Sequence, residues 1–560
     1  MVWPRDALRE DQPARWDRRD TAICLLLLAA FLGSRGLWIL AHPMSSSYWE
    51  EAYRWVAVEE IASGAAHSFL DYQADHYQGG SLVVIVLGVL LRLVGLDALV
   101  ALKLVALLFS GTTLAALYVL GHVFFGRLVG LLCGLVYLAG PPLVAFWGVV
   151  AMGFHAESAL FSLAGFGAFL ALATGSWHRT RAWFSLGLVL GLAIWFTPTA
   201  GVTLVACILT WPLLAGRPRG SALGAAAAGL SLGLAPWLVY NVFHDFAGID
   251  RILEVFGALS SADPWRSQGL GDRTRDLLLR VPTQGLLDSG GDSPGVWRSR
   301  ALSAGVWVPG GIALAAASGR ALGVLRGGRA HGDVGARREL VFLVYLVVFT
   351  AIYLASRFTL DLEPSPIAYR LMVPAAVAMI PPIAVSGARG LRAGGRAGRL
   401  SAIACSVGLA SLCAATVGFA LRHEEPGTPL SLEQGYMVWG RLVHRKHAPD
   451  VEAAVAAATR AAAGLDRERM LRGIGWAMED AYEQRGSLAD LARSLAGISQ
   501  DERSAVVRGL RWALETRRRD LAETLERRED ADLRRKLTRL DALADWVDGT
   551  ARAREPGDPW

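Results

Sequence analysis

Long apolar runs separated by short polar turns make up about the first three quarters of the chain. At 1.5 Å per residue, a helix of about 20 apolar residues crosses the ~30 Å hydrocarbon layer of a bilayer. The pattern therefore predicts an all-α polytopic membrane protein with about eleven spans. The predicted spans lie near residues 21–41, 98–120, 128–150, 157–174, 183–199, 200–215, 221–243, 301–323, 339–356, 370–387 and 400–420.

One further apolar segment, residues 81–96, either crosses the membrane or lies along its surface as an amphipathic stretch. Short cytoplasmic loops are rich in Lys and Arg, so the basic turns decide between the two arrangements. If the segment is interfacial, every basic turn falls on the side of the N-terminus, whereas a crossing places the later turns outside. We therefore expect an interfacial segment, a cytoplasmic N-terminus and an extracytoplasmic C-terminus. The basic turns contain Arg127, Arg179, Arg181, Arg217, Arg219 and the arginines of 326–338 and 389–399.

The spans divide the chain into three predicted parts. Residues 1–20 form a basic cytoplasmic segment, and the apolar run after it is too long for the core of a signal peptide, so it is predicted to be an uncleaved first span. Residues 21–420 form the transmembrane domain, with outer loops at about 42–97 and 244–300.

The third part, residues 421–560, is polar, rich in Ala and Arg, and helical in its period. It is predicted to be a helical soluble domain on the outer side. Residues 471–478, Leu-Arg-Gly-Ile-Gly-Trp-Ala-Met, are similar to residues 507–514, Val-Arg-Gly-Leu-Arg-Trp-Ala-Leu. Two copies are a weak repeat signal, so a helical appendage that packs on the membrane domain or on a partner protein is favoured over a true repeat module.

Composition supports the membrane assignment and excludes other classes. Of the 560 residues, 53% are hydrophobic and 19% are charged, and a soluble domain of this size cannot bury so much apolar surface. The formal charge of +6 comes from arginines in turns rather than from a basic stripe, which excludes nucleic-acid binding. The five cysteines all lie inside apolar runs, where they are expected to be packing residues. The high use of Arg, Ala and Gly suggests a GC-rich bacterial genome and hence a bacterial inner membrane.

Acidic residues are dense in the first outer loop, directly after the first span. Glu50 and Glu51 are adjacent, and adjacent helical residues point ~100° apart, so the two are not expected to share one role. A carboxylate at the membrane surface can act as a general base or bind a divalent metal. Glu157 follows a later span on the same predicted side, two residues after His155. The alternatives are a solvated acidic loop for the first pair and an interfacial anchor for Glu157.

Two basic residues stand at predicted outer ends of spans, where they could hold a phosphate. Lys103 lies near the start of one span, and Arg370 begins another in the sequence Ala-Tyr-Arg-Leu-Met-Val-Pro. A guanidinium grips phosphate oxygens through a forked pair of N–H groups. The simpler alternative is an arginine whose charged end snorkels to the interface and only marks the end of the span.

The order of these residues resembles the GT-C superfamily of polyprenyl-phosphate-sugar-dependent glycosyltransferases, in particular its protein mannosyltransferase and aminoarabinose-transferase branch. The resemblance covers about residues 21–390 and rests on the order and shared side of the motifs. The matching features are Glu50-Glu51 followed by Ala-Tyr, the spacing from Ala57 to Gly64, His76, Lys103, Gly126-Arg127, Glu157, Pro-Trp-Leu-Val-Tyr-Asn at 236–241, and Tyr369-Arg370 to Pro374.

The resemblance implies a helical GT-C module with interfacial helices and a loop over the donor site. It makes Glu50 the catalytic base that takes a proton from the acceptor hydroxyl, with Glu51 beside it in the catalytic set. Glu157 would assist the base or position the acceptor. The metal requirement stays open: Mg²⁺ or Mn²⁺ would be bound by Glu50, Glu51 or Glu157, or basic residues alone would suffice.

The same resemblance assigns the donor's phosphate to Lys103 and Arg370, and the rest of the substrate-binding set to His76, His155 and Tyr369. Two features depart from the family's pattern. The acidic pair more commonly begins with Asp, so a longer Glu shifts the carboxylate by about one bond length. The usual His/Lys-Pro-Pro-Leu is replaced by His-Tyr-Gln-Gly-Gly-Ser at 76–81, which leaves the lip of the donor pocket undetermined.

The sequence thus predicts an inverting transfer of one sugar from a polyprenyl-phosphate donor to a glycan, lipid or protein acceptor at the outer face of the inner membrane. The phosphate is the leaving group, and a basic residue stabilises its growing charge. One rival is a noncatalytic scaffold of an envelope assembly, which would tolerate loss of the acids. The other is a lipid or solute transporter, which would favour mid-span charges and broken helices in paired halves. The sequence has few charges in the middle of any span and no obvious pairing of halves.

Overall fold

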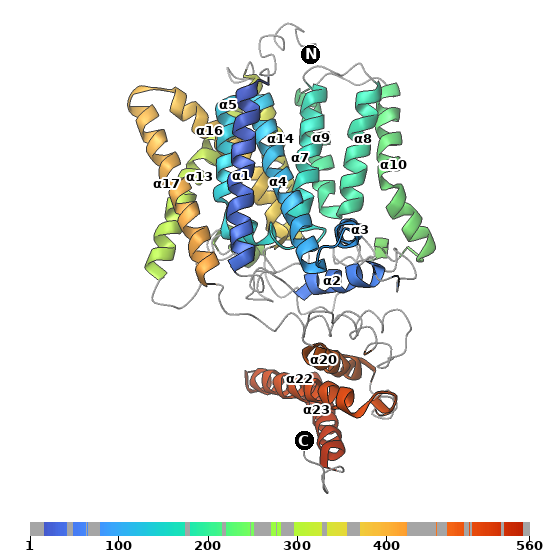
Figure 1. The fold of residues 1–560 in the computed structure, drawn as a ribbon. Helices are drawn as coiled ribbons and strands as arrows, with labels where there is room; N and C mark the ends of the chain where they lie inside the picture. Colours follow the sequence, from blue (N-terminus) through green and yellow to red (C-terminus); the bar gives the residue numbers. More distant parts are fainter. Residues whose placement is uncertain are drawn as a thin grey trace. The chain divides into compact units, whose positions relative to one another are not determined.

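The computed structural model describes residues 16–41, 49–62, 64, 79–173, 180–214, 220–246, 248–250, 270–275, 277–279, 281, 296–326, 333–355, 370–422, 455, 467–485, 492, 495–527 and 531–552. Within these ranges all regular elements are helices (Figure 1). The chain forms two compact units. The first comprises Met1–Ser46, Tyr72–Leu87 and Leu102–Glu424, and the second comprises Ser47–Asp71, Gly88–Ala101 and Glu425–Trp560.

Each predicted span contains a helix, and the predicted all-α polytopic membrane fold is confirmed. Among the described residues, 7 helices are long and apolar enough to cross a membrane. These are α1 (Arg18–Ala41), α4 (Ala98–Phe125), α10 (Gly220–Phe243), α13 (Val296–Leu325), α14 (Val334–Ala355), α16 (Val373–Arg392, preceded by the 3-10 turn η8, Arg370–Met372) and α17 (Gly395–Arg422). The shorter apolar helices in the remaining spans are α5 (Arg127–Ala139), α7 (His155–Ala171), α8 (Thr180–Phe196) and α9 (Gly201–Leu214, preceded by the 3-10 turn η4, Pro198–Ala200).

The predicted single span 128–150 is wrong as one continuous helix. Helix α5 ends at Ala139, a short helix α6 (Pro142–Trp147) follows, and residues 148–154 are not helical. Gly140 has a φ of 51°, a left-handed conformation that glycine adopts without strain. The prolines after it lack the N–H group that would continue the helix. The Gly-Pro-Pro sequence therefore causes the break, although hydropathy alone predicts one continuous span here.

The basic turns gather at one end of the first unit. Arg127 at the start of α5 binds Asp20 in the first turn of α1, with 2.6 Å between Nε and Oδ1. Arg338 in α14 donates a hydrogen bond of 2.6 Å to the carbonyl of Phe124 near the end of α4. We call this the basic end; it lies nearest the label N in Figure 1 and contains the helix ends at 17–20, 124–127, 333–338 and 389–392.

Helix α3 (Gly80–Leu93) covers the predicted interfacial segment. Its 14 residues extend about 21 Å, a length similar to that of α5 and α9, so length alone does not distinguish it from the shorter helices of the spans. The N–H of Gly79 donates to the carbonyl of Trp195 at 2.8 Å, so the helix begins at the end of α8 far from the basic end. The interfacial position of this segment stays a prediction.

Helices α8 and α10 pack closely through paired glycines. Each helix carries two glycines four residues apart, Gly187 and Gly191 on α8, Gly229 and Gly233 on α10. A Cβ added at Gly187 would lie 2.0 Å from a backbone oxygen of α10, and one at Gly229 would lie 2.1 Å from a backbone oxygen of α8. Small residues at this spacing let membrane helices approach to backbone contact, so this pairing depends on the absence of side chains.

The C-terminal part of the second unit contains α20 (Arg467–Arg485), α22 (Gln500–Arg527) and α23 (Ala531–Arg552). Their apolar faces form one core, whose most buried members are Met470, Ile474, Met478, Val506, Leu510, Leu540 and Leu543. The other faces are polar, as the helical period of this region predicts.

The similar sequences in α20 and α22 pack against each other. Trp476 and Trp512, which occupy the same position in the two copies, make an edge-on contact with 5.6 Å between ring centroids. A Cβ at Gly475 would lie 1.9 Å from the carbonyl oxygen of Val506, and one at Gly509 would lie 1.8 Å from that of Arg472. The repeated residues therefore form a close helix pair within one core.

Candidate functional site

The broken segment between α5 and α7 lies at the centre of the candidate site. All residues of 148–154 are buried. In a bilayer, backbone groups outside helices need protein partners because water is absent. Ser110 of α4 donates a hydrogen bond of 2.7 Å to the carbonyl of Gly148, and Thr416 of α17 donates one of 2.5 Å to the carbonyl of Gly140. Polar side chains from neighbouring helices thus hold the break in place.

Lys103 contacts this segment from α4. Its side chain is only 4% exposed, and its Nζ donates a hydrogen bond of 3.2 Å to the carbonyl of Val149. A buried ammonium needs such acceptors because the cost of removing its charge from water is large. The predicted phosphate-binding lysine therefore also supports the backbone of the break.

Glu157 contacts the same segment from the first turn of α7. Its carboxylate is buried, and one oxygen, Oε1, accepts hydrogen bonds from the N–H groups of Met152 at 2.8 Å and Gly153 at 3.0 Å. A carboxylate in the first turn of a helix is also stabilised by the positive end of the helix dipole. Glu157 therefore fixes the path of the chain where it enters α7.

Arg370 approaches from η8, before α16. Its guanidinium carbon lies 5.5 Å from the centroid of the Phe154 ring, within the range of a cation–π contact. The ring contact holds the guanidinium beside the end of the broken segment. A guanidinium held in one orientation presents its N–H fork in a fixed direction.

Three of the candidate residues thus meet at one short stretch of chain, residues 149–154. Lys103 binds its first residue, Glu157 binds its middle and Arg370 lies over its last residue. They come from α4, α7 and η8, which are far apart in sequence. The stretch lies at the end of the first unit opposite the basic end, since α16 runs from Arg370 to the basic turn at Arg392.

The acidic pair belongs to α2 (Trp49–Ala62), in the second unit. Glu51 is fully buried on this helix, and Arg54, one turn further on, is 1% exposed. Glu59, on the same helix, pairs with Arg92, with 3.1 Å between Arg92 Nε and Glu59 Oε1. The side chains of Glu50 and His155, and residues His76 and Tyr369, lie outside the described part of the chain.

The described side chains do not decide whether the protein binds a metal ion. In the described ranges, no group of three or more His, Cys, Asp or Glu side chains is placed to hold a metal ion. The predicted Mg²⁺ or Mn²⁺ site at Glu50, Glu51 or Glu157 stays a prediction.

Sequence reasoning missed the residues that hold the break. Arg35 of α1 donates a hydrogen bond of 3.2 Å to the carbonyl of Leu138. Like Ser110 and Thr416, it binds a backbone carbonyl near the break. The available signal was the Gly-Pro-Pro sequence that begins at Gly140 inside an apolar run. An interrupted membrane helix requires polar partners nearby, and buried Ser, Thr and Arg on adjacent spans are candidates for that role.

The chain matches no protein-family model, and no curated protein matches it in sequence. In structure it is similar to the oligosaccharyltransferase of Archaeoglobus fulgidus in the apo form, at 12% identity and a TM-score of 0.46. The match covers 76% of this chain and 58% of the archaeal protein. It is also similar to apo ArnT from Cupriavidus metallidurans, at 16% identity and a TM-score of 0.40, covering 87% of this chain and 76% of ArnT.

A further structure of the archaeal protein, AglB in complex with an inhibitory peptide and a dolichol-phosphate, matches at 11% identity and a TM-score of 0.41 over 76% of this chain and 58% of AglB. These matches are a likeness of fold to solved structures, and the chain spans little more than half the length of the archaeal protein. At these TM-scores the likeness concerns the general course of the chain and gives no residue a role.

Proposed function

We propose that this protein is a membrane glycosyltransferase that transfers one sugar from a polyprenyl-phosphate donor to an acceptor. The reaction takes place at the end of the membrane unit opposite the basic end. By the distribution of basic turns, that end faces outward from a bacterial inner membrane. The observation that carries the proposal is the convergence of Lys103, Glu157 and Arg370 on residues 149–154.

The two cations suit a phosphate leaving group. Charge develops on the phosphate as its bond to the sugar breaks, and fixed cations in a water-poor site stabilise that charge without reorganising. Arg370 supplies a forked donor and Lys103 a compact positive charge. The donor's lipid tail remains in the bilayer beside the span ends, which explains why the enzyme is built from membrane helices.

The two acids have different parts in this proposal. Oε1 of Glu157 accepts two backbone N–H groups and so orders residues 152 and 153. In this proposal Glu157 also positions the acceptor, the role that the resemblance implies. Glu50, at the start of α2, takes the proton of the acceptor hydroxyl, the role that its resemblance to the family's first-loop acid implies.

Binding of the carrier lipid tests the phosphate half of the proposal without knowledge of the sugar. Undecaprenyl phosphate should bind the purified full chain in nanodiscs, whereas undecaprenol, which lacks the phosphate, should bind at least tenfold more weakly. Arg370→Gln should weaken undecaprenyl phosphate binding about tenfold, because a charge-assisted hydrogen bond is worth about 1.5–3 kcal/mol. Arg275→Gln in the short helix α12 (Leu270–Arg275) is the matched control, since Arg275 is exposed. Equal binding of the two lipids would refute the proposal.

Turnover tests the catalytic half. The full chain is supplied with a panel of undecaprenyl-phosphate sugars and bacterial membranes as the acceptor source, and released undecaprenyl phosphate is measured. Glu50→Gln should abolish release while leaving expression and membrane insertion unchanged. The control Glu60→Gln changes another acid of α2 and should leave release unchanged. Full activity of Glu50→Gln would remove Glu50 from the role of base.

One observation favours a noncatalytic scaffold as the second candidate. Lys103 and Glu157 each have a structural hydrogen-bonding task in the broken segment, which would preserve them without catalysis. A scaffold would bind undecaprenyl phosphate no better than undecaprenol and would tolerate Glu50→Gln. The two experiments above therefore separate the candidates.

A further inference from the structure

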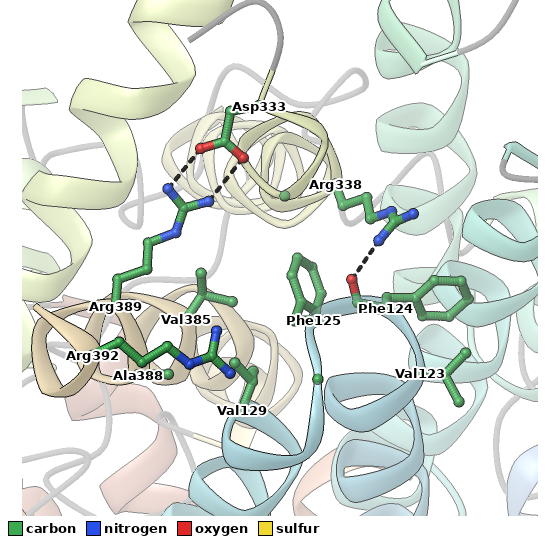
Figure 2. A pocket seen from close by; sticks show the side chains of 12 residues that line it. Val123, Phe124, Phe125, Val129, Asp333, Arg338, Val385, Ala388, Arg389 and Arg392 are labelled. Carbon is green, nitrogen blue, oxygen red and sulfur yellow. Dashed lines mark hydrogen bonds and ion pairs between the residues drawn. The ribbon is translucent and has the colours of Figure 1, made fainter. Parts of the chain in front are cut away.

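A pocket with a volume of about 280 Å³ opens at the basic end of the membrane unit. It lies among the end of α4, the start of α5, the start of α14 and the end of α16. Figure 2 shows three arginine side chains around it, Arg338 from α14 and Arg389 and Arg392 from α16. Its lining comes from three separate stretches of the chain, at 123–129, 333–338 and 385–392, so the fold assembles this arginine cluster.

Two of the arginines are held by the protein. Arg389 forms a forked pair with Asp333, with Nη1–Oδ2 and Nη2–Oδ1 distances of 2.6 and 2.9 Å. Arg338 is buried, and its Nη1 donates to the carbonyl of Phe124 at 2.6 Å. Their guanidiniums therefore have fixed positions at the pocket wall (Figure 2).

Arg392 differs from the other two. Its side chain is exposed, and within the described ranges it has no hydrogen-bond or ion-pair partner. Its Nη2 lies 3.5 Å from where a Cβ on Gly126 would stand. Gly126 is the residue before α5, and no side chain caps the start of that helix. The positive end of the α5 dipole thus adds to the positive charge of the pocket.

The charges around the pocket do not balance. Burial acts to raise the pKa of Asp333, but hydrogen bonds from Arg389 and the Ala336 N–H outweigh it and hold that pKa below its ordinary value. Asp333 is therefore ionised at neutral pH and compensates one arginine. The nearby Glu339 pairs with two arginines, Arg320 at 2.5 Å and Arg389, whose Nη2 lies 3.7 Å from Glu339 Oε1. Arg320 and Arg389 therefore take up both carboxylates, and Arg392 adds a positive charge that no described carboxylate pairs with, which leaves charge for an anion to neutralise.

The shape and position of the pocket indicate the kind of anion. Val123, Val129 and Val385 contribute an apolar part of its wall, and the arginines contribute the polar part. It lies where membrane helices end, at the level of lipid headgroups. Basic pockets between membrane helices bind phosphate-bearing headgroups, and arginine forks match phosphate oxygens.

We propose that this pocket binds a phosphate group, carried by an anionic lipid headgroup or free in solution, with Arg392 as the residue that closes on it. The inference does not depend on the proposed glycosyltransferase activity, since the pocket and Arg370 lie at opposite ends of α16. In the bound state Arg338 and Arg389 present fixed charge, and the exposed Arg392 moves onto the phosphate from solvent.

Native mass spectrometry of the full chain tests the proposal. The protein is released from nanodiscs made of phosphatidylcholine alone or with added phosphatidic acid or phosphatidylglycerol, and in a separate arm it is mixed with inorganic phosphate. The wild type should retain the anionic lipid, or the inorganic phosphate, at least tenfold more than Arg392→Gln does. The control Arg396→Gln removes an exposed arginine of α17 at the same end and should behave as the wild type.

The two arms distinguish the source of the phosphate. Retention of anionic lipid but not of inorganic phosphate identifies a headgroup site, and the reverse identifies a soluble phosphate. Equal retention by wild type, Arg392→Gln and Arg396→Gln in both arms overturns the proposal. If Arg392→Gln does not yield folded protein, Arg392→Lys is measured in the same way; it keeps the charge but loses the fork, and it should retain less ligand than the wild type.

Discussion

Arg127, the first residue of α5, makes two hydrogen bonds to Asp20 in the first turn of α1, at 2.6 Å from Nε and 3.0 Å from Nη2. Asp20 is fully buried, although it lies at the edge of an apolar run. His122 lies 3.6 Å from the same carboxylate. Arg127 belongs to the basic turns from which the sequence predicts the orientation of the chain in the membrane. It also joins the first and third predicted spans through this ion pair.

Removing the Arg127–Asp20 ion pair should lower the stability of the folded protein. Arg127→Gln removes both charged hydrogen bonds from Arg127 to the buried Asp20 carboxylate, and we expect a loss of about 1–3 kcal/mol in the free energy of unfolding. Equilibrium unfolding in mixed detergent measures it. Arg399→Gln, which removes an exposed arginine from the same end, should change stability by less than about 0.5 kcal/mol. Equal stability of the two variants would show that the pair contributes nothing.

Gly153 should not tolerate a side chain. Its φ is 76°, and an added Cβ would stand 2.4 Å from the backbone carbon of Gly80. Gly153→Ala should therefore cost about 3 kcal/mol or more, or prevent folding. Gly167→Ala, within α7 and with nothing within 4 Å, should be neutral or stabilising. The yield of monodisperse protein and the unfolding midpoint are the measurements, and a stable Gly153→Ala protein would contradict the described path of the break.

Two substitutions distinguish the structural role of Glu157 from its proposed role in the reaction. Glu157→Gln keeps a carbonyl oxygen that can accept the N–H groups of Met152 and Gly153, so the fold should be nearly as stable as the wild type. Glu157→Ala leaves both buried N–H groups unsatisfied and should cost about 1–3 kcal/mol per group. If Glu157 positions the acceptor, Glu157→Gln should reduce release of undecaprenyl phosphate about tenfold or more despite its stability. Unchanged release would leave Glu157 a structural residue only.

The stability of the first turn of α22 should depend on pH because of Glu502. The hydroxyl and N–H groups of Ser499 donate to Glu502 Oε2 at 2.6 and 3.0 Å, and these bonds lower the pKa of Glu502 although burial opposes them. Because the folded pKa lies below the ordinary value of 4.5, the stabilisation is fully present above that pH and is lost as pH falls through the folded pKa.

Hydrogen exchange in the full chain, corrected for intrinsic rates, measures this effect in the peptide that covers residues 500–510. Protection should fall as the solution is acidified below about pH 4.5 in the wild type. Glu502→Gln cannot titrate and should show no such change in the same peptide. A parallel loss of protection in both proteins would assign the acid sensitivity to other groups.

The orientation of the chain can be measured with cysteine labelling. Among the described cysteines none forms a disulfide, so a cysteine-free background is expected to fold. A single cysteine in place of Arg275 should react with a membrane-impermeant maleimide on intact spheroplasts, and one in place of Arg399 should react only after lysis. The opposite result would reverse the proposed sidedness and move the proposed reaction to the cytoplasmic face.

The sequence by itself determined the membrane helices and the common end of the basic turns. Whether a stretch of chain forms a span depends on its own length and hydropathy, and these are local properties. The glycine pairs of α8 and α10 and the Gly-Pro-Pro break after α5 are also visible in the sequence. The contacts that these features make are not visible in the sequence, because each contact depends on which helix packs against the feature.

Only the tertiary structure decided which side chains meet. It brought Lys103, Glu157 and Arg370 to residues 149–154, and it assembled the arginine pocket from the ends of α4, α5, α14 and α16. Hydropathy fixes how far each helix extends across the bilayer, but not its neighbours or its rotation. Those follow from side-chain packing and from satisfying buried polar groups, which involve several spans at once.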